Sequence, residues 1–219
     1  MRGMRIFMLG VLLSGGLLLG QGILIEAKAW LAQGLIARAW DRTLAERHPV
    51  TPWPWSDTWP VARLGFPHRG ISLMVLRGDQ GASLAFGPGW TERTALPGRA
   101  GVSVISGHRD THFRVLQDLQ PGEILTIQTS EGQLLSYRVV ETRVVDQSLG
   151  WQWPLERFGS GHPELLLVTC YPFDAQLPGG PLRYLVRAEQ VAPAETRIEP
   201  GSPMEPLHPG VRGGSSKMM

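Results

Sequence analysis

The feature that most constrains the fold is a series of short apolar or alternating segments that fills the middle of the chain. The segments are 61–66, 71–76, 101–108, 123–129, 134–145, 164–173 and 183–191. Glycine and proline, with 27 and 18 copies, recur between these segments, and both residues favour turns. Many short strands separated by turns are typical of a barrel or a sandwich. We therefore expect a mainly β domain.

An uncharged apolar run occupies positions 6–25 and matches the about 20 residues that a helix needs to cross a bilayer. Arg2 and Arg5 precede the run, so the positive-inside rule places the N-terminus in the cytoplasm. A cleavable signal peptide is the alternative, because Ala-Lys-Ala at 27–29 resembles a cleavage site. The run exceeds the usual signal core in length, which favours a retained single-pass anchor. Both alternatives predict an extracytoplasmic domain.

The chain divides into four predicted parts. A helical spacing of apolar residues runs through 26–47 and is interrupted only by Gly34. The segment TPWPWSDTWP then ends any helix, and beyond about Pro193 the composition turns to proline, glycine, serine and charge. The predicted parts are a cytoplasmic tip and transmembrane anchor (1–30), a juxtamembrane helix and Trp/Pro-rich linker (31–60), a catalytic β-barrel (61–192) and a disordered tail (193–219).

Charge and cysteine content limit the classes of function. The formal net charge is +2 and the basic residues are scattered, whereas nucleic-acid binders concentrate lysine and arginine on one face. We therefore predict no nucleic-acid partner. Cys170 is the only cysteine, so no intrachain disulfide can form. Its thiol is either a small buried apolar group or a reactive group.

Three residues with useful chemistry lie where predicted strands begin or end. Cys170 ends one strand, and Pro172 cannot extend the hydrogen-bonded ladder beyond it. His108 follows another strand, and Arg183 opens the last one. A thiol with a pKa of about 8.5 needs a base or a cation nearby to ionise, and an arginine can stabilise an oxyanion. Spacing alone leaves open that His108 and Arg183 are ordinary surface residues.

Over positions 61–191 the sequence resembles the sortases, which are cysteine transpeptidases of bacterial cell surfaces. The resemblance rests on the glycine-histidine step at 107–108, the threonine-cysteine pair at 169–170 and Arg183, in this order along the chain. The cysteine motif of the family is usually written T-L-x-T-C. Leu166 stands here where the first threonine belongs, so no role of that threonine is carried over.

The resemblance implies both a fold and a mechanism. It implies a closed β-barrel with short helices, Cys170 as nucleophile, His108 as general acid/base and Arg183 as oxyanion stabiliser, with Val168 and Thr169 as candidate substrate-binding residues. The implied partners are a protein with an LPXTG-like C-terminal sorting signal and an amine acceptor, and no cofactor is needed. The Trp/Pro-rich entry PWPWSDTWPVARL and the single anchor resemble the class GN sortases of proteobacteria, which implies an inner-membrane enzyme with a periplasmic domain.

Several alternatives remain at this level. Arg187 lies four residues after Arg183 and so on the same strand face. An L,D-transpeptidase is also an exported β-rich cysteine enzyme, although its pattern of histidine, serine and glycine leading into the cysteine is absent before Cys170. A non-catalytic anchored β-domain that binds a surface protein is the third possibility. His108 and His112 have helical metal-ligand spacing, but two histidines do not complete a zinc site, and we predict no metal.

Overall fold

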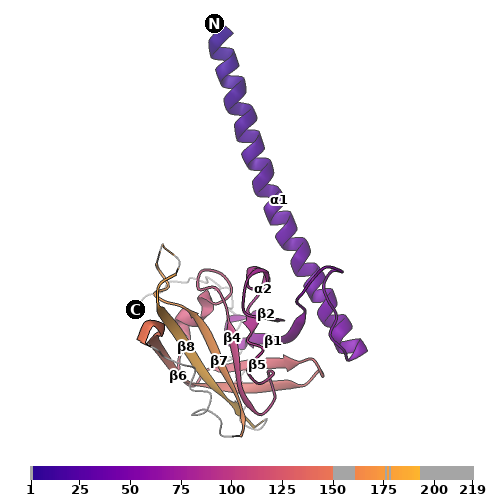
Figure 1. Ribbon diagram of the computed structural model, residues 1–219, viewed down its shortest axis with the longest axis vertical. Coiled ribbons are helices and arrows are strands. Elements are labelled where there is room, and N and C mark those ends of the chain that lie inside the picture. Colours follow the sequence, from indigo (N-terminus) through magenta and orange to yellow (C-terminus); the bar gives the residue numbers. More distant parts are fainter. Residues whose placement is uncertain (1, 150–160, 176, 178, 193–219) are drawn as a thin grey trace, which may run out of the picture.

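The computed structural model describes residues 2–149, 161–175, 177 and 179–192. Eight strands form a closed barrel in the order β1-β2-β3-β4-β7-β8-β6-β5 (Figure 1). The strands are β1 (Pro60–Phe66), β2 (Ile71–Arg77), β3 (Gly89–Trp90), β4 (Gly101–Ser106), β5 (Ile124–Thr129), β6 (Leu134–Asp146), β7 (Pro163–Cys170) and β8 (Leu182–Val191). The mainly β barrel expected from the sequence is confirmed.

Short helices fill the connections between the strands, as the sequence also predicted. They are the α-helix α2 (Ala82–Phe86) and the 3-10 helices η1 (Pro67–Arg69), η2 (Arg114–Asp118) and η3 (Gln147–Leu149). All seven predicted β segments contain a strand. The strand β3 was missed, because two residues are too few to show an alternating pattern.

A single helix, α1 (Arg2–Glu46), precedes the barrel. Its C-terminal part buries Ala32, Ile36, Ala39, Trp40 and Thr43, which recur every three or four residues and therefore share one helix face. That face packs on β1 and α2, while the N-terminal part extends away from the barrel (Figure 1). The predicted juxtamembrane helix is thus continuous with the segment before it, and Gly34 does not interrupt it.

Two predictions concern residues that the structure describes only in part or not at all. Among the side chains that are described, no helix combines the length and the apolar character needed to cross a membrane. Most side chains of the predicted anchor at 6–25 lie outside the described set, and the predicted disordered tail at 193–219 lies outside it entirely.

The sheet formed by β4, β7 and β8 has a buried apolar cluster on each face. Leu165 and Leu167 of β7 belong to the cluster that fills the barrel. Leu166 and Val168 belong to a second cluster, together with Leu185 of β8. Because successive side chains of a strand point to opposite faces, the second cluster lies on the outer face of the barrel.

Candidate active site

The structure brings the three predicted catalytic residues to one edge of the barrel. Cys170 is the last residue of β7, and the antiparallel register pairs it with Arg183 of β8. On the other side of β7, the parallel strand β4 pairs Ser106 with Val168. Continuing this register by two residues places His108 level with Cys170. The strand order β4-β7-β8 therefore puts the cysteine between the histidine and the arginine.

The alternation of side chains along a strand also places the Cys170 thiol and the Arg183 guanidinium on the same face of the sheet. Cys170 lies two residues beyond Val168, and Arg183 lies two residues before Leu185, and both reference residues belong to the outer cluster. Cys170 is half-buried with a free thiol, and His108 is exposed. A substrate on the outer face can therefore meet the thiol and the guanidinium, and the exposed His108 lies level with Cys170 in the register.

The turn that carries His108 is fastened to the end of β7. The hydroxyl of Thr169 donates a hydrogen bond to the carbonyl of Gly107 at 2.7 Å, and the Gly107 amide donates to the Val168 carbonyl at 3.0 Å. A side chain at Gly107 would meet the ring of Phe113 at 2.8 Å, which is closer than carbon atoms approach, so only glycine fits. The register between His108 and the cysteine strand is thus fixed by sequence.

The same contacts bear on the two candidate substrate-binding residues. Thr169 is 2% exposed and Val168 is 4% exposed. The hydroxyl of Thr169 is engaged with the Gly107 carbonyl, which gives this residue a local structural role. Substrate binding by Val168 and Thr169 stays a prediction.

The two arginines that the sequence left as alternatives have different surroundings. Nη1 of Arg183 donates to the carbonyls of Gly180 at 2.6 Å and Leu182 at 2.8 Å. Within the described part of the chain, no carboxylate forms an ion pair with it, and its Nε and Nη2 groups make no hydrogen bond. Arg187 instead pairs with Leu166 in the register, four residues before the cysteine, and it binds carboxylates. Arg183 therefore lies opposite Cys170 without a carboxylate partner among the described residues, as the predicted oxyanion role requires.

A second histidine lies close enough to His108 to interact with it electrostatically. Burial and the nearby charge of His108 lower the pKa of His112 below its usual value. His112 lies in the turn between β4 and η2 and is half-buried. In the sequence, only the four-residue spacing between the two histidines indicated that they could lie near each other. Among the described residues, no three metal-ligating side chains cluster.

A cleft of about 720 Å³ opens beside the cysteine. It is lined by Arg109, Asp110, Arg114, Gln117, Tyr171, Pro172, Phe173, Asp174 and Tyr184. The rings of Tyr171 and Tyr184 stack with centroids 6.2 Å apart, and Phe173 meets Tyr184 edge-on at 5.2 Å. A larger hollow of about 880 Å³ lies near Arg77 and Asp79, but neither cysteine nor histidine lines it.

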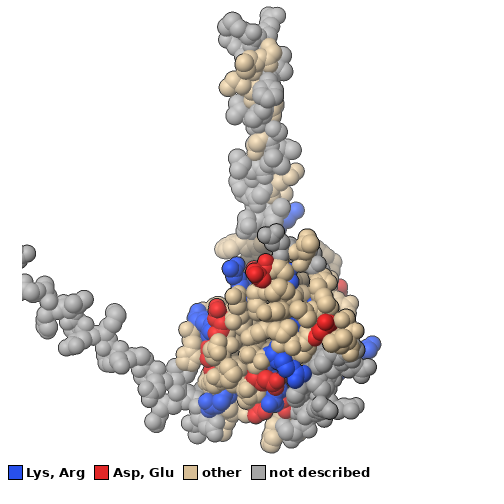
Figure 2. All heavy atoms as spheres, turned by 90° about the vertical axis from the view of Figure 1, so that its left-hand side faces the viewer, with Lys and Arg blue, Asp and Glu red and all other residues tan. Residues whose placement is uncertain are grey.

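Basic and acidic side chains are interspersed over the barrel on the face shown in Figure 2. Elsewhere on the barrel, basic and acidic side chains form ion pairs, such as Arg69 with Glu123 and Arg99 with Glu131. The hydrogen bond from Arg69 lowers the pKa of Glu123. These pairs lie outside the cleft beside Cys170, so the charge that is available to a substrate there comes from the cleft's own residues.

Comparison with known proteins identifies relatives of this barrel. A family model described as the sortase domain matches residues 64–191. The chain is 31% identical over 128 residues to Sortase D of Bacillus subtilis, an alignment that covers 58% of this chain and 62% of that protein. The matched region thus spans less than two thirds of that relative's length.

Solved structures share the same architecture. Sortase A from Corynebacterium diphtheriae superimposes with a TM-score of 0.53 at 25% identity, covering 63% of each chain. Sortase C-1 from Actinomyces oris gives a TM-score of 0.51 at 29% identity, covering 61% of this chain and 75% of that one.

Proposed function

Because the chain belongs to the sortase family of cysteine transpeptidases, we propose that it cleaves an LPXTG-like C-terminal sorting signal of a partner protein and transfers the cleaved protein to an amine acceptor. The observation that carries the proposal is the strand register, which pairs Cys170 with Arg183 and brings His108 level with the cysteine from the other side. The residues proposed as nucleophile, acid/base and oxyanion donor thus lie at or just beyond the ends of three adjacent strands.

The proposed reaction has two halves. In the first, the Cys170 thiolate attacks the scissile carbonyl, and the guanidinium of Arg183 stabilises the resulting oxyanion. The intermediate collapses with loss of the leaving amine, which takes its proton from the imidazolium of His108, and a thioester remains on Cys170. In the second, neutral His108 takes a proton from the incoming amine as it attacks the thioester, and the cysteine leaves as thiolate.

The proposal includes a place in the cell and a subfamily. The uncharged run at 6–25, preceded by Arg2 and Arg5, supports a single-pass anchor with the barrel outside the cytoplasm. The Trp/Pro-rich entry before β1 supports assignment to the class GN sortases of proteobacteria, and hence an inner-membrane enzyme with a periplasmic domain. Its substrate would then be a dedicated protein that carries the sorting signal.

The alternatives are less well supported. The sortase model covers the cysteine, the histidine and the arginine together, and the residues before Cys170 differ from the pattern of L,D-transpeptidases. A purely binding domain does not account for a half-buried thiol that lies opposite an arginine without a carboxylate partner among the described residues.

Intact-protein mass spectrometry tests the function. The full-length protein in detergent micelles is incubated with LPXTG-like peptides, beside Cys170→Ala and an exposed-surface control, Arg143→Ala. We expect an acyl adduct on the wild type and on the control that is discharged by added amine, and a loss of at least about 10³-fold in Cys170→Ala. Absence of any adduct, while Cys170 still reacts with iodoacetamide, would contradict the substrate assignment. A thiol that also resists alkylation would favour the binding domain.

A further inference from the structure

The residue that follows His108 reaches across the site to the connection between β7 and β8. The guanidinium of Arg109 is half-buried, and its Nη2 donates hydrogen bonds to the carbonyls of Ala175 at 2.8 Å and Leu177 at 2.9 Å. These carbonyls lie 66 and 68 residues further along the chain. Arg109 thus joins the turn that carries the acid/base to the connection that begins after the nucleophile.

The same connection holds the oxyanion arginine. Nη1 of Arg183 is anchored on the carbonyl of Gly180, which lies three residues beyond Leu177. Both arginines therefore bind backbone carbonyls of one connection, Arg109 from the turn after β4 and Arg183 from the start of β8. Displacement of that connection would move the Gly180 carbonyl, which is one of the two carbonyls that hold the Arg183 guanidinium, while the second, that of Leu182, stays at the start of β8.

The backbone of the nucleophile does not depend on this clamp. Cys170 and Arg183 are paired in the β7–β8 ladder, and the amide of Tyr171 donates to the carbonyl of Leu182 at 3.0 Å. Loss of the Arg109 contacts would leave those backbone positions in place. What changes is the orientation of the Arg183 side chain and the wall of the cleft that Arg109 shares with Asp174.

We propose that Arg109 is a positioning residue, which fastens the β7–β8 connection through the Ala175 and Leu177 carbonyls and thereby holds the Arg183 guanidinium in its oxyanion-binding orientation. Arg114 provides a matched control. It lines the same cleft, is exposed, and makes no side-chain hydrogen bond within the described part of the chain. Removing its charge therefore changes the cleft electrostatics without releasing the connection.

Hydrogen exchange on the full-length protein tests the clamp without any substrate. In Arg109→Met, the peptide that joins Cys170 to Leu182 should exchange about tenfold faster, because two hydrogen bonds to a charged group are lost. Arg109→Lys, which keeps a charged donor, should restore part of the protection, and Arg114→Met should match the wild type. Unchanged exchange in Arg109→Met, or equal loss in Arg114→Met, would overturn the proposal.

A kinetic arm rests on the proposed function and measures thioester formation with a sorting-signal peptide. Arg109→Met should lower kcat about tenfold with KM within about twofold, because a small misplacement of an oxyanion donor affects the transition state more than binding. The alkylation rate of Cys170 should stay unchanged. In an Arg183→Lys background, Arg109→Met should lower kcat by less than about threefold, since the effects of two residues are not additive when one acts through the other.

The two arms separate failure of the positioning role from failure of the function. Full additivity with Arg183→Lys, or faster exchange with an unchanged kcat, would show that Arg109 does not act through Arg183. If the wild type forms no thioester with any peptide, the proposed function fails, and the exchange experiment still decides whether Arg109 clamps the connection.

Discussion

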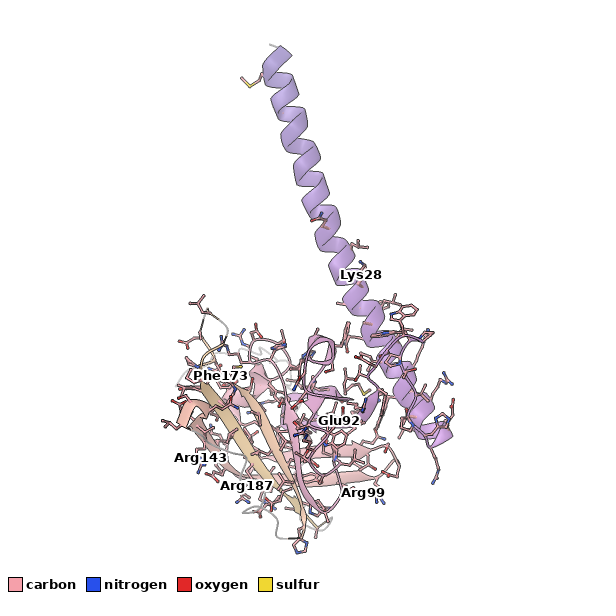
Figure 3. All side chains as sticks on the ribbon, in the orientation of Figure 1. Lys28, Glu92, Arg99, Arg143, Phe173 and Arg187 are labelled. Carbon is pink, nitrogen blue, oxygen red and sulfur yellow. The ribbon has the colours of Figure 1, made fainter. Side chains whose placement is uncertain are left out.

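Two arginines of β8, four residues apart on the same strand face, illustrate how differently the two ends of this sheet are built. Arg183 lies opposite Cys170 and is held by two backbone carbonyls. The β7–β8 connection, which includes Phe173, lies at one end of the sheet, and Arg187 lies farther along β8 toward the other end (Figure 3). Its Nη1 binds the carboxylates of Glu164 at 3.1 Å and Glu189 at 2.6 Å.

The two arginines differ in whether neighbouring carboxylates neutralise the positive charge of the guanidinium. Carbonyl oxygens orient the Arg183 guanidinium without neutralising it, so its positive charge stays available to a developing oxyanion. Burial lowers the pKa of Arg187, but hydrogen bonds and charges of Glu164 and Glu189 outweigh it and raise the pKa above its usual value. Arg187 is thus committed to ion pairs, including one with the buried carboxylate of Glu164, which is 3% exposed.

Replacing Arg183 should have the largest effect on activity. Arg183→Lys keeps the positive charge but loses the planar fork that can hold the backbone and the oxyanion together. We expect kcat for thioester formation to fall about 10²- to 10³-fold, the usual cost of removing one oxyanion donor. Single-turnover mass spectrometry measures this, and Arg187→Lys is the matched control. An equal loss in both variants would contradict the distinction between the two ends.

Replacing Arg187 should affect stability instead. Arg187→Met leaves the buried carboxylate of Glu164 without this partner, and we expect a loss of about 2 kcal/mol in the free energy of unfolding, reduced from the full cost of breaking a buried pair because Arg187 is 23% exposed. Urea unfolding measures it. Adding Glu164→Gln should recover part of the loss, and kcat per folded molecule should stay within about threefold. Wild-type stability with impaired kcat would reverse the roles of the two arginines.

The sequence predicted the strand ends that carry the candidate catalytic residues better than the contacts that hold those residues in place. Strand boundaries at Cys170, His108 and Arg183 were visible because strands alternate and end at turn residues. The sequence favoured Arg183 over Arg187 because Arg183 opens its strand, but the two arginines share one strand face, and their different partners became visible only with the register and the position of Glu164. Register depends on pairings between strands far apart in the chain, which no local pattern contains.

The contacts that position the site were hidden for a related reason. The hydrogen bond from Thr169 to Gly107 spans 62 residues, and those from Arg109 span more. The hydroxyl of Thr169 donates to the backbone of the turn that carries His108, a contact that the sequence did not predict, and substrate binding by Thr169 stays a prediction. The fold class needed only the repeating pattern of strands and turns, while the roles of individual polar side chains needed the three-dimensional partners.

The smallest expected effect is a difference between the two ends of the sheet in how they contribute to the pH dependence of the free energy of unfolding. Burial and the charge of His108 lower the pKa of His112, so below a pH of about 6.5 the unfolded chain binds a proton that the folded chain resists. Stability from this group is therefore complete above that pH and is lost as pH falls toward the depressed pKa of the folded state. His112→Gln should remove that part of the loss between pH 7.5 and 5.5.

The expected difference is less than about 1 kcal/mol, because one whole pKa unit corresponds to about 1.4 kcal/mol. Urea unfolding at both pH values measures it. His162→Gln is the control, since His162 is exposed and precedes β7 at the end of the sheet away from Cys170. An identical pH dependence in the wild type and His112→Gln, or an equal change in His162→Gln, would show that the loss of stability at low pH does not come from the end of the sheet that carries Cys170. A change confined to His112→Gln would show that this loss of stability arises beside His108, where proton transfer is proposed to occur.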